Sequence, residues 1–171
     1  MSRHVGIATD DLVRDVLRPV LADLGLASPA AERLLVGTAA HESLLGELRQ
    51  NAAGGRPGVA RGIYQIEPWV VDDFARSWLA YRPAWRDRLG AYLAPAPAAL
   101  EVRLAGDLVY QTALARLLYY RVPAPLPAAD DLVGLARYWK DHWNTAAGAG
   151  TVEKWLADWR RLVAPFYREA A

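Results

Sequence analysis

The chain has 171 residues, of which 53% are hydrophobic and 23% are charged, and its 20 Lys and Arg nearly balance its 19 Asp and Glu. These values are typical of one folded domain that spans residues 1–171, exclude a largely disordered chain, and give no reason to expect nucleic acid as a partner. The absence of cysteine excludes a disulfide scaffold, a thiolate metal site and a thiol nucleophile.

Apolar residues at helical spacing dominate the chain and predict an all-α fold, or an α fold with a minor β-hairpin, of about six to seven helices. Pro19 predicts a kink or a break in the first helix. The Gly- and Pro-rich residues 47–62 predict a loop that would hold the hairpin. The expected helices, opened by capping residues and closed by glycine, proline or asparagine, cover about residues 9–25, 29–45, 68–79, 83–93, 98–120, 131–144 and 152–168.

The first residues carry no secretory signal pattern, because charged residues run from Asp10 to Arg18 where an apolar core would be needed. No stretch approaches about 18 uncharged apolar residues, so no membrane span is expected. We therefore expect a protein that is made in the cytoplasm without a signal peptide.

A first polar cluster, Thr38–Ser43, lies at the end of the second expected helix. Leu34, Leu35 and Thr38 precede Glu42 on neighbouring turns, so the Glu42 carboxyl lies on a face that is apolar for two turns. Desolvation and the negative end of the helix dipole both raise the pKa of such a carboxyl. A raised pKa is what a general acid needs near neutral pH. The alternative is an exposed surface glutamate.

Two further clusters lie at helix boundaries. In residues 61–68, Gly62 permits a positive φ and Gln65 supplies an amide, although a plain loop-to-helix junction has the same pattern. In residues 138–145, the aromatic rings share one helical face, which is usually core, and Asn144 is also a common helix stop.

Together, Glu42-Ser43, Gly62-Ile63-Tyr64-Gln65 before a helix, and Trp143-Asn144 occur in an order that resembles the soluble lytic transglycosylase branch of the lysozyme-like superfamily, bacteriophage or prophage type. That family carries Glu-Ser, Gly-Leu-Met-Gln and Ala-Tyr-Asn motifs in this order. The resemblance covers roughly residues 30–165 and implies a lysozyme-like catalytic domain.

The resemblance implies a glycosidase that cleaves peptidoglycan between N-acetylmuramic acid and N-acetylglucosamine. Glu42 would protonate the glycosidic oxygen and then act as base while the muramic 6-hydroxyl attacks the anomeric carbon, which gives a 1,6-anhydro product. The implied substrate-binding residues are Ser43, Gly62, Ile63, Tyr64, Gln65, Tyr138, Trp143 and Asn144.

The sequence departs from the family pattern at several positions. Tyr64 replaces the motif methionine, and the loop from Glu42 to Gly62 is longer than in typical members. Trp143 stands where the family has a tyrosine hydroxyl that hydrogen-bonds the catalytic glutamate. An indole donates one hydrogen bond and accepts none, so the pKa of Glu42 would be set differently from that of the family glutamate. Tyr138 is a substitute candidate for the hydrogen-bond partner.

The reaction depends on whether a second carboxylate faces Glu42, since hydrolytic glycosidases generally use a pair. Glu47 would project away if the helix continued, and Glu67, Asp72 and Asp73 would approach only through folding. The single-carboxylate transglycosylase route is therefore favoured, while muramidase hydrolysis stays open.

No metal or cofactor is expected, because His4, His41 and His142 do not pair at metal-ligand spacing and the glycine-rich loop lacks the Lys-Ser/Thr of a phosphate loop. The implied partner is the peptidoglycan glycan strand, with other phage virion or lysis proteins as further candidates. The enzyme would act at the wall after release, or be carried in a phage particle. The alternative function is a catalytically weak or inactive lysozyme-like virion or accessory protein that binds cell wall or serves in assembly.

The aromatic composition is unusual, with 7 Trp and 8 Tyr against 2 Phe. Rings with a polar group suit interfaces and sugar-facing surfaces. The stripe on the last helix predicts that Trp155 and Trp159 belong to the core. The rings expected in a glycan cleft are those of Tyr64, Tyr138, Trp139 and Trp143.

Overall fold

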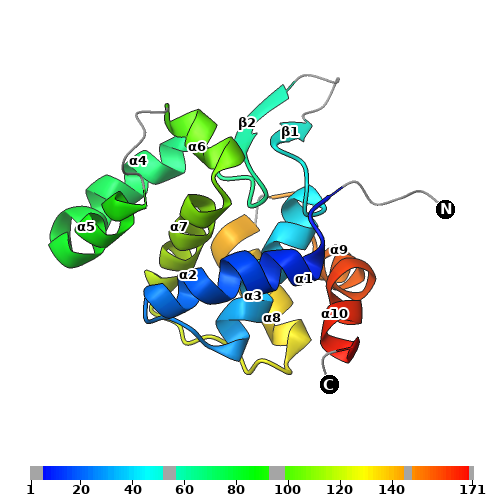
Figure 1. Ribbon diagram of the computed structural model, residues 1–171. Coiled ribbons are helices and arrows are strands. Elements are labelled where there is room, and N and C mark those ends of the chain that lie inside the picture. Colours follow the sequence, from blue (N-terminus) through cyan, green and yellow to red (C-terminus); the bar gives the residue numbers. More distant parts are fainter. Residues whose placement is uncertain (1–5, 52–56, 93–98, 145–147, 170–171) are drawn as a thin grey trace.

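The computed structural model describes residues 6–51, 57–92, 99–144 and 148–169. It is mostly helical, with 70% helix and 4% strand, which confirms the expected class (Figure 1). The expected positions Leu93, Ala98 and Thr145 lie outside the described residues. The elements are α1 (Thr9–Asp11), η1 (Leu12–Leu17), α2 (Arg18–Asp23), α3 (Pro29–Ser43), β1 (Arg49–Asn51), β2 (Pro57–Arg61), α4 (Pro68–Ser77), η2 (Leu79–Tyr81), α5 (Pro83–Ala91), α6 (Leu100–Gly106), α7 (Leu108–Tyr120), α8 (Leu132–Trp139), η3 (Lys140–Asn144), α9 (Val152–Asp158), η4 (Trp159–Val163) and α10 (Ala164–Glu169).

The helix around Pro19 is not broken, since α1, η1 and α2 run on as one helix. The stretch before Pro19 is π-helical, and the Arg18 N–H donates to the Val13 carbonyl, five residues back. A wider turn of this kind accommodates a proline, which has no N–H to donate. The helix ends where sequence analysis placed its end, at Gly25 with a φ of +65°.

Helix α3 is the central element and carries Glu42 in its last turn. Its start follows the expected pattern, because the Ser28 hydroxyl caps the Ala31 N–H at 3.1 Å and Pro29 opens the helix. Its end comes earlier than Leu45: Leu44 and Leu45 have φ values of 52° and 62°. A left-handed pair cannot extend a right-handed helix, so the chain turns away at this point.

The expected long helix over residues 98–120 is wrong, because it divides into α6 and α7 at Asp107. Asp107 has a φ of −100° and a ψ of 92°, and its side chain caps α7 by accepting from the Tyr110 N–H at 2.9 Å. Aspartate competes for backbone donors in this way at a helix start. With α1–η1–α2, α8–η3 and α9–η4–α10 each counted as one helix, and without the short η2, the described residues form eight helices rather than six to seven.

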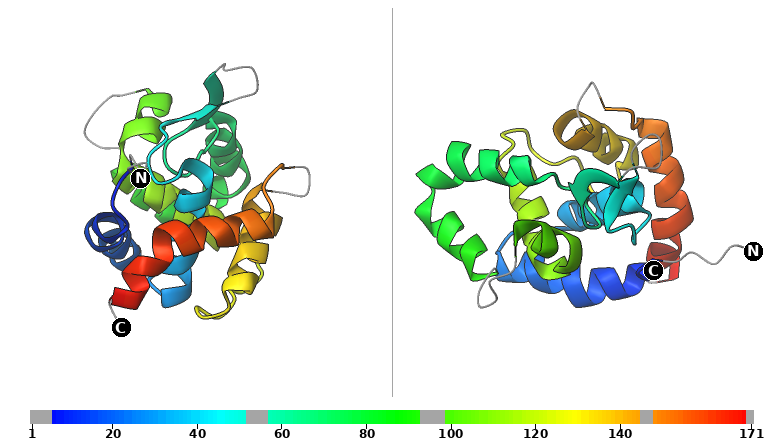
Figure 2. Two further views of the ribbon diagram at one scale, coloured as in Figure 1. Left: turned by 90° about the vertical axis from the view of Figure 1, so that its right-hand side faces the viewer. Right: turned by 90° about the horizontal axis from the view of Figure 1, so that it is seen from above.

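The expected hairpin is confirmed, since β1 and β2 pair antiparallel with Arg49 opposite Arg61. Helices α4, α5 and α6 lie on one side of α7, and α9 and α10 lie on the far side of α3 (Figures 1 and 2). Among the described residues, no helix has the length and apolar character needed to cross a membrane.

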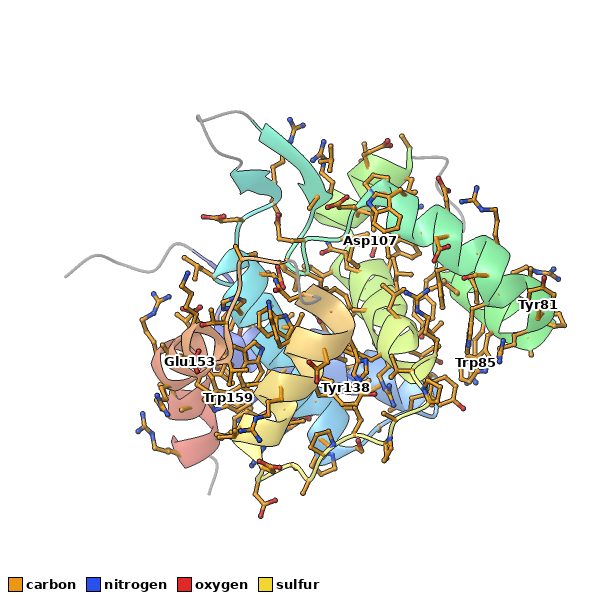
Figure 3. All side chains as sticks on the ribbon, turned by 180° about the vertical axis from the view of Figure 1, so that it is seen from behind. Tyr81, Trp85, Asp107, Tyr138, Glu153 and Trp159 are labelled. Atoms are coloured by element: carbon orange, nitrogen blue, oxygen red, sulfur yellow. The ribbon has the colours of Figure 1, made fainter. Side chains whose placement is uncertain are left out.

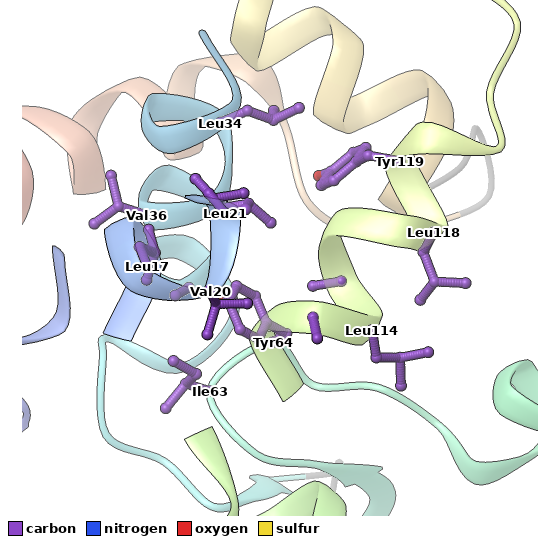
Figure 4. Close-up of a cluster of buried hydrophobic side chains, with 14 of the residues drawn as sticks. Leu17, Val20, Leu21, Leu34, Val36, Ile63, Tyr64, Leu114, Leu118 and Tyr119 are labelled. Atoms are coloured by element: carbon purple, nitrogen blue, oxygen red, sulfur yellow. The ribbon is translucent and has the colours of Figure 1, made fainter. Parts of the chain in front are cut away.

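The core lies between the first helix, α3 and α7. Figure 4 shows side chains from these elements meeting those of Ile63 and Tyr64, which enter from the segment after β2. Trp155 and Trp159 are also buried, and their rings stack with centroids 5.4 Å apart. This confirms that the stripe on the last helix belongs to the core.

Candidate functional site

Glu42 is a partly buried residue at the end of α3. Its Oε1 atom accepts a hydrogen bond of 3.0 Å from the Trp139 indole N–H of α8. Burial raises the pKa of the carboxyl from 4.5 to about 7, and the indole hydrogen bond opposes part of that rise. The raised pKa expected from the apolar face of the helix is therefore confirmed, and the group is poised to hold or release a proton near neutral pH.

The indole that contacts Glu42 belongs to Trp139 and not to Trp143, the position matched to the family tyrosine. Trp139 lies one helical turn earlier and is completely buried. Tyr138, the other expected partner, donates its hydroxyl to the Ala124 carbonyl at 2.9 Å. Figure 3 shows Tyr138 on α8, next to the helix that carries Glu153 and Trp159. Sequence spacing could not separate these positions, because all of them share one broad helical face.

Tyr119 of α7 is a further neighbour of Glu42 that sequence analysis missed. Its hydroxyl shares a hydrogen bond of 2.8 Å with the Thr38 hydroxyl, one turn before Glu42 on α3. Burial raises the pKa of Tyr119 well above its usual value, and the negative charge of Glu42 adds to that rise. The phenol is therefore a neutral group beside the carboxyl.

The segment Gly62 to Tyr64 is part of the core and not of an open cleft. The Ile63 N–H donates to the Gln111 side-chain oxygen at 2.9 Å, and the Tyr64 hydroxyl pairs with Thr112 at 3.1 Å. A Cβ on Gly62 would lie 2.0 Å from the Leu104 carbonyl oxygen, so glycine is required there. Because these residues are buried, the substrate contact expected of them is not available.

Ser43 is likewise buried, and its hydroxyl donates to the Ala39 carbonyl at 3.0 Å. The expected glycan-stacking role is also wrong for three of the four rings, since Tyr64, Tyr138 and Trp139 are buried. Trp143, which is only partly buried, is the exception. Of these four rings, that of Trp143 at the helix end is the one that reaches the surface.

Gln65 reaches a surface groove. It has a φ of 49°, and its amide N–H group donates to the carbonyls of Gly62 at 2.8 Å and Glu47 at 3.1 Å. Its side-chain oxygen is buried and has no hydrogen-bond partner among the described residues. A buried acceptor left in this state favours a ligand or water that can donate to it.

The groove has a volume of about 330 Å³ and lies between α4, the end of α7 and η3. Gln65, Trp143 and Asn144 line it, so the structure brings these three predicted site residues together. Trp69, which is 61% exposed, supplies a second indole at the same groove. Glu42 is not in the lining, but its charge acts on Tyr119, whose ring is 5.0 Å from that of Trp143.

Asn144 also approaches the surroundings of Glu42. Its side-chain oxygen accepts from the Lys140 ammonium group at 2.8 Å. A Cβ on Gly150 would lie 2.5 Å from the Trp139 ring and 3.0 Å from the Asn144 amide nitrogen. The lack of a side chain at Gly150 therefore allows Asn144 and Trp139 to approach the same backbone position.

Burial and the Trp139 indole are the causes that shift the pKa of Glu42, and no carboxylate of the described residues is among them. Glu67 and Asp73 line the groove, but each has another partner. Glu67 accepts from the Trp69 indole and Asp73 pairs with Arg121 at 3.5 Å. The arrangement therefore offers a carboxyl of raised pKa that lies outside the lining of a polar, aromatic groove.

No group of three or more His, Cys, Asp and Glu in the described part of the chain is placed to hold a metal ion. Comparison with protein-family models, with curated proteins and with solved structures gives no match for this chain. The functional interpretation therefore rests on the site itself and on the motif order.

Proposed function

We propose that this chain is a lysozyme-like, peptidoglycan-cleaving glycosidase in which Glu42 is the general acid and base, of the lytic transglycosylase type found in phages and prophages. The observation that carries the proposal is the Glu42 carboxyl, which burial brings to a pKa of about 7 in the last turn of α3. The groove that contains Gln65, Trp143 and Asn144 lies nearby and offers amides and an indole for a sugar chain.

The geometry suggests how Glu42 would begin the reaction. Because the Trp139 N–H donates to Oε1, the proton of the neutral acid is carried by Oε2. Glu42 would pass that proton to the glycosidic oxygen as the bond from this oxygen to the anomeric carbon breaks. The indole would then stabilise the carboxylate that is left.

The same carboxylate would complete the reaction. It would accept the proton of the muramic 6-hydroxyl while that oxygen bonds to the anomeric carbon, which returns Glu42 to its neutral form and consumes no water. A hydrolase would need a second carboxyl about 5–9.5 Å away to activate water or bond the sugar. No carboxylate is among the causes that shift the pKa of Glu42, and the proposal therefore keeps the single-carboxylate transglycosylase route.

The decisive experiment compares wild-type protein, Glu42→Gln and the control Glu47→Gln on purified cell walls. Glu47 is an exposed acid five residues further along the chain, so its replacement should leave clearing unchanged. Glu42→Gln should lose about 100- to 10,000-fold of the activity while keeping the fold, because general acid–base catalysis contributes that much. Full activity in Glu42→Gln would refute the role of Glu42.

The mass of the product separates the two reactions, since an anhydro-sugar is one water lighter than the hydrolytic product. Inactive wild-type protein that sediments with cell walls would instead favour the wall-binding virion or assembly role. For the active enzyme, the proposed place of action is the cell wall, reached after release or within a phage particle.

A further inference from the structure

His41 precedes Glu42 on α3 and has its own partner. Its Nδ1 atom lies 2.9 Å from the Asp158 carboxylate at the end of α9, and the two side chains are only 11% and 19% exposed. The pair joins the helix of Glu42 to the C-terminal helices. Sequence analysis considered His41 only as a metal ligand and excluded it from that role.

The proton of His41 can be placed from these contacts. Burial lowers the pKa of His41, with a smaller contribution from Lys154, although Asp158 opposes the change. The imidazole is therefore neutral at neutral pH. A carboxylate can only accept, so Nδ1 carries the proton and donates to Asp158, while Nε2 keeps its lone pair.

The His41 ring also contacts the indole that holds Glu42. The two ring centroids are 4.5 Å apart with an interplanar angle of 71°, an edge-on arrangement. A Cβ on Gly150 would lie 2.5 Å from the Trp139 ring and 3.0 Å from His41 Nε2, so the Gly150 backbone packs against both side chains. Asp158, His41, Trp139 and Glu42 thus form an unbroken series of contacts.

We propose that His41, held by Asp158, is a positioning residue for Glu42: it fixes the Trp139 indole in the orientation that donates to Oε1. The charged and titratable groups that face this series are Arg161 of η4, which donates to Asp158 Oδ1 at 2.8 Å, Tyr119 from α7 and Lys154 from α9. The consequence for catalysis rests on the proposed function, whereas the positioning itself is a property of the folded chain.

The direct test follows the Trp139 indole N–H signal by nuclear magnetic resonance, with the signal assigned from Trp139→Phe. In the wild type the signal should titrate with a midpoint near pH 7, and in Glu42→Gln it should not titrate there. In His41→Ala the indole is no longer held, the Glu42 carboxylate loses a donor, and the midpoint should move to higher pH. An unchanged midpoint and line width in His41→Ala would overturn the proposal.

Two pairs of variants separate the contacts. His41→Phe keeps a ring against Trp139 but loses Asp158, whereas His41→Asn keeps an amide donor for Asp158 but loses the ring. The midpoint should rise least in His41→Phe and most in His41→Asn. Asp158→Asn retains an oxygen that accepts from Nδ1 and should behave as the wild type, while Asp158→Ala should resemble His41→Phe. Equal behaviour of all four variants would contradict the ordered series.

Kinetics on a soluble glycan strand give the catalytic consequence. A misplaced acid costs about ten- to a hundredfold in rate, so His41→Ala should lose this much kcat with little change in KM. The control is Tyr167→Phe, which removes a hydrogen bond of 2.8 Å to Glu32 on the same helix and should leave kcat and the pH profile unchanged. A fall of equal size in the control would show that His41 acts through stability alone.

The two proposals fail in different ways. If Glu42→Gln still clears cell walls, the proposed function is wrong, and the resonance experiment still decides whether His41 positions the indole. If Glu42→Gln is inactive and His41→Ala matches the wild type in both kcat and the indole titration, only the positioning role is wrong.

Discussion

Helix α3 holds a carboxylate near each end, and the two are bound in different ways. Glu32 accepts from the Arg18 guanidinium at 2.8 and 3.1 Å and from the Tyr167 hydroxyl at 2.8 Å. Glu42 accepts one hydrogen bond, from the neutral Trp139 indole at 3.0 Å. A cation keeps a carboxylate ionised, whereas burial without one favours the neutral acid. One helix therefore carries a structural ion pair at its start and a carboxyl suited to proton transfer at its end.

The largest effect expected from this contrast between Glu32 and Glu42 is on the pH dependence of stability. The pKa of Glu42 is about 7 in the fold against an ordinary value of 4.5, so the native state binds more protons than the unfolded state between these values. The free energy of unfolding that Glu42 contributes is fully present below pH 4.5 and is lost as the pH rises through 7. At pH 8 the loss is roughly 3 kcal/mol.

Glu42→Gln removes this titration, so the variant should be more stable than the wild type at pH 8 and about equal to it at pH 4. Urea unfolding of both proteins at each pH measures the difference. Glu47→Gln, an exposed control, should show no such change with pH. A Glu42→Gln difference that is constant from pH 4 to 8 would mean that burial does not hold the carboxyl neutral.

An intermediate effect is expected when the indole hydrogen bond is removed. Trp139→Phe deletes a donor that favours the ionised carboxyl, so the basic limb of the activity profile should move upward by about one pH unit. Trp155→Phe is the matched control, because the Trp155 indole nitrogen is buried without a hydrogen-bond partner among the described residues. The curves of activity against pH for Trp139→Phe and the wild type should cross. An equal shift of the curve in Trp155→Phe would contradict the assignment of Trp139 as the hydrogen-bond partner of Glu42.

The smallest effect is expected at the other end of the helix. Glu32→Gln weakens a pair in which the Arg18 side chain is 50% exposed, so it should cost about 1 kcal/mol of unfolding free energy, and less in high salt. Wall clearing should be unchanged. Loss of clearing at constant stability would place Glu32 in the functional site and remove the contrast between the two ends.

Sequence patterns predicted local features well, because those features depend on few residues. Helix starts were expected at capping residues, and Ser28, Asp131 and Thr151 do accept from backbone N–H groups at helix starts. A partly buried Glu42 followed from the two apolar turns before it. The break at Asp107 was missed because an aspartate inside a helical pattern can also lie on an exposed helical face. Its capping role appears only when the chain bends.

Contacts between distant residues could not be predicted. Trp139 contacts Glu42 from 97 positions further along the chain. The aromatic residues next to it share the same helical face, so the sequence pattern did not indicate which of them would contact Glu42. Tyr119 and Asp158 had no local pattern at all, because their importance comes from how α7 and α9 pack on α3. The motif order indicated helix ends that lie near one another in the fold, but several residues that it assigned to a cleft are buried in the core.

The left-handed pair Leu44 and Leu45 has a consequence for how the sites are connected. Each such residue costs about 1–2 kcal/mol of backbone energy, and burial of the Leu45 side chain, which is 1% exposed, offsets part of it. The reversal sends the chain directly to the second motif, where the Leu48 carbonyl accepts from the Gly62 N–H at 3.0 Å and the Glu47 carbonyl accepts from the Gln65 amide at 3.1 Å. The backbone that ends α3 thus also holds the Gln65 amide at the groove. An insertion after α3 would therefore separate Glu42 from the groove, whereas a side-chain substitution there would leave the backbone connection intact.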